Sequence, residues 1–181
     1  MRTSRRSSAV GRPLSAEEVG SRLRARFGDD VEVADTFGQV AATVTVDRYH
    51  DLVRFLRDEP ELACDFCDFT GGVDLGPDGG FEVVTQLTST EHHHDVRVKV
   101  RLPSTEPACP TISDLFPTCD WHERETMEMF GIRFEGHPHP VKLLLAEPFE
   151  GFPLRKDFPL MSREVKPWPG VPEGEEVEDD E

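Results

Sequence analysis

Residues 94–102 alternate between apolar and charged side chains, and this period of two is the strictest pattern in the chain. Successive side chains of an extended strand point to opposite faces, so the pattern predicts a strand with one buried and one solvated face. Residues 81–87 are typical of a second strand, and residues 88–93 join the two as a hairpin. The predicted buried face carries Val96, Val98, Val100 and Leu102, and the other face carries Asp95, Arg97, Lys99 and Arg101. The chain must therefore supply elements that cover one face of a sheet.

Two helices are predicted to provide this cover. Ser15 and Glu18 have the spacing of a capping box, in which each residue satisfies a backbone amide near the start of the helix. Apolar residues then recur on one face at Val19, Leu23 and Phe27, and Gly28 is expected to end the helix. Asp47 is expected to cap a second helix. Its apolar face consists of Tyr49, Leu52, Val53 and Leu56.

Further strands are predicted at residues 31–33, 40–46 and 62–69, and a glycine-rich turn at residues 76–80. A loop is expected at residues 103–110. Helices and hairpins intermix without a regular βαβ rhythm, which argues against a parallel sheet. The predicted fold class is therefore α+β: a mostly antiparallel sheet with two main helices on one face, followed by a short helix and an extended C-terminal arm.

We divide the 181 residues into four parts. Residues 1–14 carry four arginines and no acid, which indicates a disordered basic leader or, as the alternative, an organellar transit peptide. Residues 15–134 are expected to form the α+β core domain. Residues 135–161, called the arm from here on, are rich in proline and glycine and are expected to be an extended docking segment. Residues 162–181 hold eight acids against two basic residues, which predicts an acidic, flexible tail.

The composition disfavours several classes of function. A net charge of −16 and a pI of about 4.8 disfavour a free nucleic-acid-binding protein, which needs a basic surface. No apolar run approaches the roughly 20 residues that a membrane span needs, so membrane association is expected only through a partner. Four cysteines do not make a disulfide framework in a chain of this size, and a reducing cytoplasm is the simplest compartment.

The cysteines and histidines could in principle bind a metal. Residues 64–67 form a Cys-Asp-Phe-Cys motif, but on a strand its two thiols would point to opposite faces, so structural cysteines are favoured. Cys109 and Cys119 match no cluster spacing. The three consecutive histidines at residues 92–94 are expected to lie in a solvated turn. His137 and His139 each precede a proline, which favours a rigid connector over a weak metal site.

Residues 120–130 predict a short helix with unusual side chains. Asp120 and Glu123 resemble a second capping box, and Arg124 and Glu128 have the spacing of an ion pair one turn apart. Two interpretations remain open: a surface helix with salt bridges, or an interface helix with Trp121 and Arg124 as anchors. Glu123 and Glu125 could do acid–base work, but no nucleophile, ligand set or phosphate loop accompanies them.

The end of the arm supports the interface interpretation. Residues 149–160 place aromatic and proline residues around Arg155, Lys156 and Asp157, in a segment whose proline and glycine limit helix formation and favour an extended backbone. It is too apolar to be left in water alone. The segment is therefore expected either to fold back on its own domain or to wrap a neighbouring protein.

These blocks together resemble the 30 kDa (C-type) subunit of the proton-pumping NADH:quinone oxidoreductase (respiratory complex I). The resemblance spans residues 15–160 and includes segments 68–74 and 96–100. The chain departs from the family pattern at Glu128, usually Asp, at Pro140-Val141, more often Leu-Arg, and at Phe152, where His is frequent. The signature and expected interface residues are Trp121, Glu123, Arg124, Glu125, Glu128, Phe130, Gly131, Gly136, His137, Pro138, Arg155, Lys156, Asp157, Phe158 and Pro159.

The resemblance implies a subunit with no catalytic, cofactor-binding or metal-binding residues of its own. It implies a place in the peripheral arm of the complex, scaffolding the quinone-site subunit (the D or 49 kDa type), the cluster-bearing B-type subunit and other peripheral-arm subunits. These would carry electrons from NADH to quinone, coupled to proton translocation, with FMN and the iron–sulfur clusters held in other subunits. The expected location is peripheral on the cell membrane, on the cytoplasmic side, or on the matrix side in an organelle.

Two alternatives remain open at this stage. Related subunits of membrane-bound nickel–iron hydrogenases and ferredoxin-dependent complexes share much of the signature, and co-purified partners would separate them from complex I. A free-standing thiol or metal-binding protein that uses Cys64, Cys67 and the histidines is the second alternative, and metal analysis of the purified chain would test it.

Overall fold

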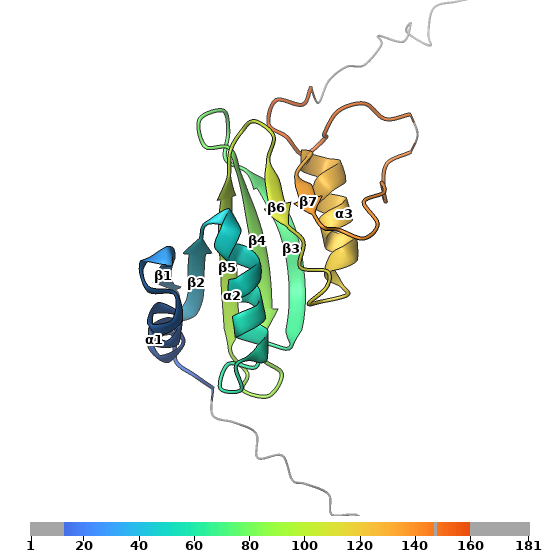
Figure 1. Cartoon of the computed structure of the whole chain (residues 1–181). Helices are drawn as coiled ribbons and strands as arrows, with labels where there is room; N and C mark the ends of the chain where they lie inside the picture. The colour runs from blue at the N-terminus through green and yellow to red at the C-terminus, as the bar shows by residue number, and fades with distance from the viewer. Residues whose placement is uncertain (1–12, 147, 160–181) are drawn as a thin grey trace, which may run out of the picture.

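A five-stranded sheet forms the centre of the molecule (Figure 1). The structure is a computed structural model, and it describes residues 13–146 and 148–159. The strands lie in the order β1-β2-β5-β4-β3, and only the pairing of β2 with β5 is parallel. Their bounds are β1 Val31–Thr36, β2 Gln39–Val44, β3 Phe66–Asp74, β4 Phe81–Thr88 and β5 Asp95–Leu102. The predicted α+β class with a mostly antiparallel sheet is confirmed.

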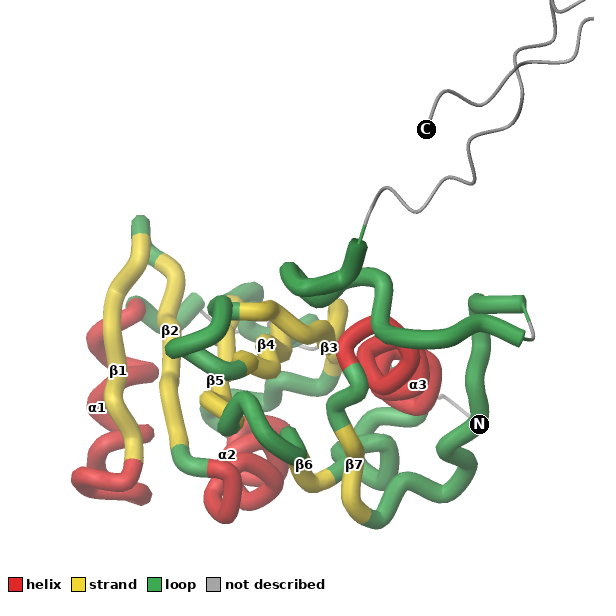
Figure 2. Tube along the Cα trace, turned by 90° about the horizontal axis from the view of Figure 1, so that it is seen from above, coloured by secondary structure: helices red, strands yellow, loops and turns green. Residues whose placement is uncertain are grey.

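Three α-helices accompany this sheet: α1 (Ala16–Phe27), α2 (Val46–Asp58) and α3 (Cys119–Phe130). A short 3-10 turn, η1 (Gly28–Asp30), follows α1. The two shortest strands, β6 (Ala108–Pro110) and β7 (Arg133–Glu135), pair with each other in a separate parallel ribbon. Figure 2 shows α3 beside β3 at one end of the sheet, with α1 beside β1 at the other. The arm passes around α3.

One row of residues across the sheet shows that all three helices lie on the same face. Cross-strand pairing aligns the row Val33, Ala42, Val98, Thr85 and Thr70. Helix α1 contacts Val33 through Gly20, α2 bonds Thr85 through the Tyr49 hydroxyl (2.7 Å), and α3 contacts Thr70 through Cys119. The predicted pair of covering helices is therefore a set of three, and the charged side chains of β5 lie on the opposite face.

The core lies between this face and the helices. The alternation of residues 94–102 is confirmed, because all four apolar side chains on its predicted inner face are buried. The predicted apolar faces of α1 and α2 are buried as well, apart from the half-buried Phe27. Complete burial of such a side chain contributes about 1.5–3 kcal/mol each. The largest buried side chains on these two helices are Leu23, Tyr49, Leu52 and Leu56.

Gly72 allows α3 to approach the sheet closely. A Cβ atom placed on Gly72 would lie 2.7 Å from Cδ2 of Phe130, so any larger residue would push the end of α3 away from β3. The backbone amide of Thr70 on the same strand donates to Nδ1 of His122 at 3.3 Å. Helix α3 therefore covers part of the free edge of β3, where an unpaired strand would otherwise expose its amides.

Several element boundaries differ from the sequence-based prediction. The capping box at Ser15 is present, but α2 is preceded by Thr45, and Asp47 lies inside its first turn. Strand β3 begins at Phe66 rather than at residue 62, because Ala63 has a positive φ of 42° and the preceding residues form turns. The predicted loop at residues 103–110 contains β6. These differences arise where tertiary pairing decides the backbone conformation.

The terminal predictions lie largely outside the described residues. The tail at residues 162–181 and most of the leader at residues 1–14 belong to the parts that the structure leaves undescribed. Within the described residues 136–146 and 148–159 of the arm, no helix or strand is formed, in agreement with its proline and glycine content. The arm therefore depends on contacts with the core domain for its conformation.

Candidate interface on helix α3 and the arm

Helix α3 ends at Gly131, which adopts a left-handed conformation (φ 72°) and donates its amide to the carbonyl of Met127. Glycine adopts this conformation without strain, which is why it commonly terminates helices. A Cβ atom at this position would also lie 2.6 Å from Cζ of Phe152 and 2.6 Å from Nη2 of Arg155. Gly131 therefore ends the helix and leaves the space that the arm occupies.

Arg124 and Glu128 hold the backbone of the arm at residues 141–145. Nε and Nη2 of Arg124 donate to the carbonyls of Val141 (2.8 Å) and Lys142 (3.2 Å). The carboxylate of Glu128 accepts from the three amides that follow, at 2.7–2.9 Å, namely those of Leu143, Leu144 and Leu145. We call this arrangement the backbone clamp. The ion pair predicted between Arg124 and Glu128 is not formed; Arg124 instead lies 3.9 Å from Asp120.

The hydrogen bonds of the clamp favour the ionised form of Glu128. Burial alone would raise the pKa of Glu128, but the hydrogen bonds from the amides of Leu144, Leu143 and Leu145 keep that pKa below its usual value. Glu128 is therefore ionised at neutral pH. A charged acceptor with several amide donors forms stronger bonds than a neutral one. The residue that departs from the usual Asp of the family signature is therefore fully engaged within the chain.

Glu123 is buried in the protein rather than exposed on a surface helix. Its carboxylate accepts from the hydroxyl of Thr111 and from the amide of Ile112 (2.7 Å). Burial raises the pKa of Glu123 to about 7, although these two hydrogen bonds act in the opposite direction. The predicted capping box at Asp120 is wrong, because α3 begins at Cys119 without a side-chain cap and Asp120 lies inside its first turn. Glu123 instead anchors the loop that leads into α3.

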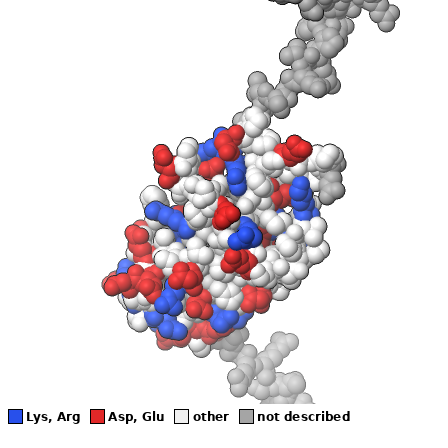
Figure 3. Space-filling view, turned by 45° about the horizontal axis from the view of Figure 1, so that its top comes forward, with Lys and Arg blue, Asp and Glu red and all other residues white. Residues whose placement is uncertain are grey.

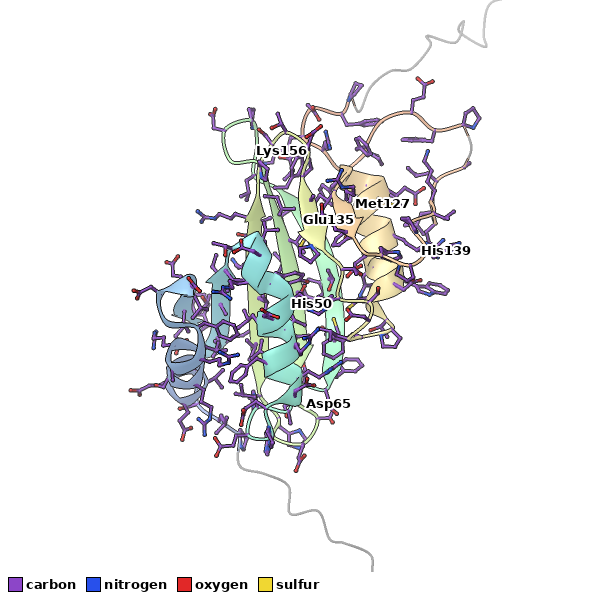
Figure 4. All side chains as sticks on the ribbon, viewed as in Figure 1. His50, Asp65, Met127, Glu135, His139 and Lys156 are labelled. Carbon is purple, nitrogen blue, oxygen red and sulfur yellow. The ribbon has the colours of Figure 1, made fainter. Side chains whose placement is uncertain are left out.

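His137 joins the start of the arm to the first turn of α3. Its Nδ1 accepts from the amide of His139 (3.0 Å), so the proton of the neutral ring lies on Nε2 and is donated to the carbonyl of Asp120 (3.2 Å). The same Nε2 is 3.4 Å from the Asp120 carboxylate and 3.8 Å from that of Glu123. Figure 4 shows His139 on the arm, next to α3, the helix that carries Met127. These contacts link the start of the arm to the N-terminal end of α3.

Arg155 provides a second attachment of the arm to the core. Its Nε donates to the carbonyl of Phe130 (2.6 Å), and its guanidinium lies over the rings of Phe152 (4.4 Å) and Phe81 (4.9 Å). The amide of Lys156, which Figure 4 shows at one end of the sheet, donates to Asp74 (2.8 Å). That bond lowers the pKa of Asp74. Of the two expectations for the arm, folding back on its own domain is confirmed for these residues.

The clamp leaves several large apolar side chains in solvent. Trp121 on α3 is 64% exposed, and on the arm Leu144 is 57%, Leu154 55% and Val141 49% exposed. On the face drawn in Figure 3, charged side chains are dense at one end and sparser over the rest. The sequence identified Trp121 but missed Val141 and Leu144. The signal that could have found them is the cluster of apolar residues at positions 141 and 143–145, directly after Pro138 and Pro140.

The signature residues thus divide into two groups. The first is engaged within the chain, and its members contact the arm, the loop before α3 or the core: Glu123, Arg124, Glu128, Phe130, Gly131, His137 and Arg155. The second has exposed or half-buried side chains, although the amide of Lys156 bonds Asp74: Trp121, Glu125, Gly136, Pro138, Lys156, Asp157, Phe158 and Pro159. Phe158 stacks on Phe149, with 6.0 Å between ring centroids. Within residues 13–146 and 148–159, no group of three or more His, Cys, Asp or Glu is arranged to hold a metal ion.

Known proteins are similar to this chain over most of its length. The C-type subunit of NADH-quinone oxidoreductase from Roseiflexus castenholzii is 42% identical over 154 residues, which cover 84% of this chain and 88% of the relative. The same subunit of Herpetosiphon aurantiacus is 43% identical over 145 residues, covering 80% and 84%. The family model for the 30 kDa subunit of respiratory-chain NADH dehydrogenase matches residues 42–164.

Solved structures show the same fold. The trypsin-resistant fragment 1–134 of Nqo5 superimposes with a TM-score of 0.58 at 26% identity, covering 68% of this chain and 97% of that fragment. A chain of the archaeal membrane-bound sulfane sulfur reductase shares the fold, with a TM-score of 0.63 at 23% identity over 80% of this chain and 86% of that chain.

The sheet, the helices and the sequence relatives define an α+β protein of the Nqo5 type. The chain belongs to the 30 kDa subunit family of respiratory-chain NADH dehydrogenase, which includes the C-type subunits of NADH-quinone oxidoreductase. In the part of the chain that the structure describes, no helix is both long and apolar enough to cross a membrane.

Proposed function

We propose that this chain is a non-catalytic subunit in the peripheral arm of NADH:quinone oxidoreductase, and that α3 and the arm hold its neighbours in register. The neighbours would be the quinone-site subunit of the 49 kDa type and the cluster-bearing B-type subunit. The observation that carries the proposal is the backbone clamp. Arg124 and Glu128 hold residues 141–145 through main-chain atoms and leave Val141 and Leu144 exposed.

A clamp of this kind suits a docking segment. Holding an extended segment through its own side chains would use up the groups that could contact a partner. Here the main chain is held, so the arm is already ordered before any partner binds, and less conformational entropy is lost on association. Preordered segments bind more tightly for the same contact area.

Trp121 is the most exposed aromatic residue of α3 and lies on the helix that holds the arm. Tryptophan is enriched among the side chains that contribute most to protein–protein binding, because it buries a large apolar area with few rotatable bonds. Isolated exposed apolar residues are ordinary on a protein surface. Trp121, Val141 and Leu144 instead belong to one helix and the segment that this helix binds, which supports an interface.

A subunit of this kind affects turnover without chemistry of its own. FMN, the iron–sulfur clusters, NADH and the quinone would be bound by other subunits, and electron transfer between them falls steeply with distance. A chain that fixes the separation of its neighbours therefore controls the rate of electron transfer to quinone, and with it proton translocation. Its association with the cell membrane would be peripheral, on the cytoplasmic side, and through the assembled complex.

The experiment is affinity purification of the tagged chain from its own cells, with identification of the partners and measurement of NADH:quinone activity in membranes. We expect a double variant, Trp121→Ala with Leu144→Ser, to lose its partners and most of this activity while the purified chain keeps its unfolding temperature. Phe37→Ser is the matched control, since Phe37 is fully exposed on the turn between β1 and β2, far along the sheet from α3.

The outcomes of this experiment separate the proposed function from its alternatives. A double variant that assembles and supports turnover as the wild type does would show that this surface is not the interface. Co-purification of an NADH-oxidising flavoprotein supports membership of complex I. A nickel-bearing large subunit in its place would instead assign the chain to a hydrogenase-type complex.

A further inference from the structure

Two cysteines that are far apart in the sequence meet inside the protein. The Sγ atoms of Cys67 and Cys119 lie 3.2 Å apart, and the two residues are separated by 52 positions. Cys67 belongs to β3 and Cys119 is the first residue of α3. The sequence motif suggests Cys64 as the neighbour of Cys67, but Cys64 lies before β3 and its thiol is near Nε2 of His94 at 3.8 Å. The relevant thiol pair is therefore formed by tertiary structure.

An irregularity in β3 turns Cys67 toward α3. The register of β3 against β4 shifts between Cys67 and Phe69, so Asp68 is an extra residue in the strand. In a regular strand, Cys67 and Thr70 would point to opposite faces. The bulge places both on the face that carries α3, and Oγ1 of Thr70 lies 3.8 Å from Sγ of Cys67 and 3.7 Å from Sγ of Cys119.

The surroundings distinguish this pair from the other two thiols. The S–H of Cys119 donates to Cys67 and lowers the pKa of Cys67, although burial acts in the opposite direction, and the same bond raises the pKa of Cys119. Burial raises the pKa of Cys64 to about 12 and raises that of Cys109 as well. Because the thiolate is the reactive form, Cys67 is the thiol with the greatest nucleophilic character of the four. It also keeps 3% of its surface exposed, whereas Cys119 has none.

We propose that Cys67 and Cys119 form a modification site, at which hydrogen peroxide converts the two thiols into a disulfide that joins β3 to α3. The Cys67 thiolate attacks one peroxide oxygen, the O–O bond breaks, and a sulfenic acid and one water result, the water taking the proton of the Cys67 thiol. The sulfur of Cys119 then attacks the sulfenic sulfur, the S–O bond breaks, and a second water leaves with the proton of Cys119. Two thiols are oxidised by two electrons and one peroxide is reduced to two waters.

The disulfide would act on the part of the protein that holds the arm. Helix α3 is seated on β3 through Phe130 at its far end and through Cys119 at its start. A covalent bond at Cys119 would prevent the first turn of α3 from separating from the sheet. The clamp residues Arg124 and Glu128 are carried by this helix, so the oxidised chain would keep the arm docked under conditions that release it from the reduced chain.

The test uses the full-length purified chain, treated with hydrogen peroxide at concentrations that leave its circular dichroism unchanged. Free thiols are blocked after unfolding, disulfides are then reduced and labelled, and the peptides are mapped by mass spectrometry. We expect label on Cys67 and Cys119 together, an intrachain crosslink between their peptides, and a rise of about 5 to 10 °C in the unfolding temperature that reductant reverses.

Cysteine-to-alanine variants identify the two thiols that form the disulfide. Cys67→Ala and Cys119→Ala should each abolish the crosslink and the rise in unfolding temperature. Cys109→Ala, which removes an equally buried thiol, should retain both. The proposal would be overturned by a crosslink that involves Cys64 or Cys109. It would also be overturned by a Cys67 that proceeds to sulfinic acid without a crosslink, or by four thiols that remain free. The peptide map of the wild type decides between these outcomes even where a variant fails to fold.

Discussion

Arg124 and Glu128 stand one helical turn apart and form no ion pair with each other, since both are bound to the same short stretch of main chain. Arg124 donates to two consecutive carbonyl oxygens, and Glu128 accepts from the three amides that follow. An arginine and a glutamate at this spacing usually support a helix by pairing on its surface. In this protein their charges are used to attach an extended segment to the helix.

We expect Glu128→Ala to release residues 143–145 from α3 while the core domain stays folded. Loss of three hydrogen bonds to a charged acceptor should reduce the free energy of local opening by about 2–3 kcal/mol. Hydrogen exchange of the amides of Leu143, Leu144 and Leu145 should therefore become about 30-fold faster or more. Glu125→Ala is the control, because Glu125 lies exposed on the same helix. Equal exchange rates in the two variants would contradict the clamp.

The stability of the protein should carry a pH dependence that originates at Glu123. Its pKa is raised from 4.5 to about 7 in the folded state, so the folded protein binds more protons than the unfolded chain between these values. The contribution of Glu123 is therefore fully present below pH 4.5 and is lost as the pH rises to about 7. A shift of this size corresponds to about 3 kcal/mol.

Urea unfolding of the wild type and of Glu123→Gln between pH 4.5 and pH 7 tests this expectation. The difference in free energy of unfolding between the two should change by a few kcal/mol across the range, in favour of the glutamine variant at the higher pH. Titrating groups that do not interact with Glu123 cancel in this difference, including His94, whose pKa burial lowers. Two parallel curves would show that Glu123 keeps an ordinary pKa in the folded state.

Gly131 and Gly38 form a matched pair for substitution by alanine. Both have a positive φ, of 72° and 81°, so both variants carry the same kind of backbone strain, about 1 kcal/mol. A Cβ atom on Gly38 would meet nothing within 4 Å, whereas one on Gly131 would collide with Phe152 and Arg155. Gly131→Ala should therefore lower the unfolding temperature clearly more than Gly38→Ala. It should also make residues 152–158 accessible to protease.

Arg155→Lys should behave as a disruptive substitution. The guanidinium of Arg155 stacks on Phe81 and Phe152 while its Nε bonds the carbonyl of Phe130, and an ammonium group cannot reproduce this planar geometry. We expect faster hydrogen exchange at residues 154–156 in this variant. Arg133→Lys should change nothing comparable, since Arg133 is exposed and its ion pair with Glu135 lies on the surface.

Much of the core followed from local patterns. The period of two in β5, the capping box at Ser15 and the apolar face of α2 were sufficient because each reports which side of its own element is buried. The burial of Glu123 could not be predicted in this way. A glutamate in a polar helix gives no local sign that a threonine hydroxyl and an amide will enclose it. The meeting of Cys67 with Cys119 was hidden for the same reason, since neither the bulge at Asp68 nor the packing of α3 on β3 leaves a sign in the local pattern.

The clamp also separates two demands on the arm. Because Arg124 and Glu128 hold residues 141–145 through carbonyl oxygens and amide nitrogens, every residue except proline at the amide positions offers them the same groups. The hydrogen bonds of the clamp are thus independent of the identity of the side chains at residues 141–145, although Leu145 also packs against the core. The exposed positions, such as Val141 and Leu144, can therefore be substituted to suit a different partner protein while the clamp still holds the segment in place.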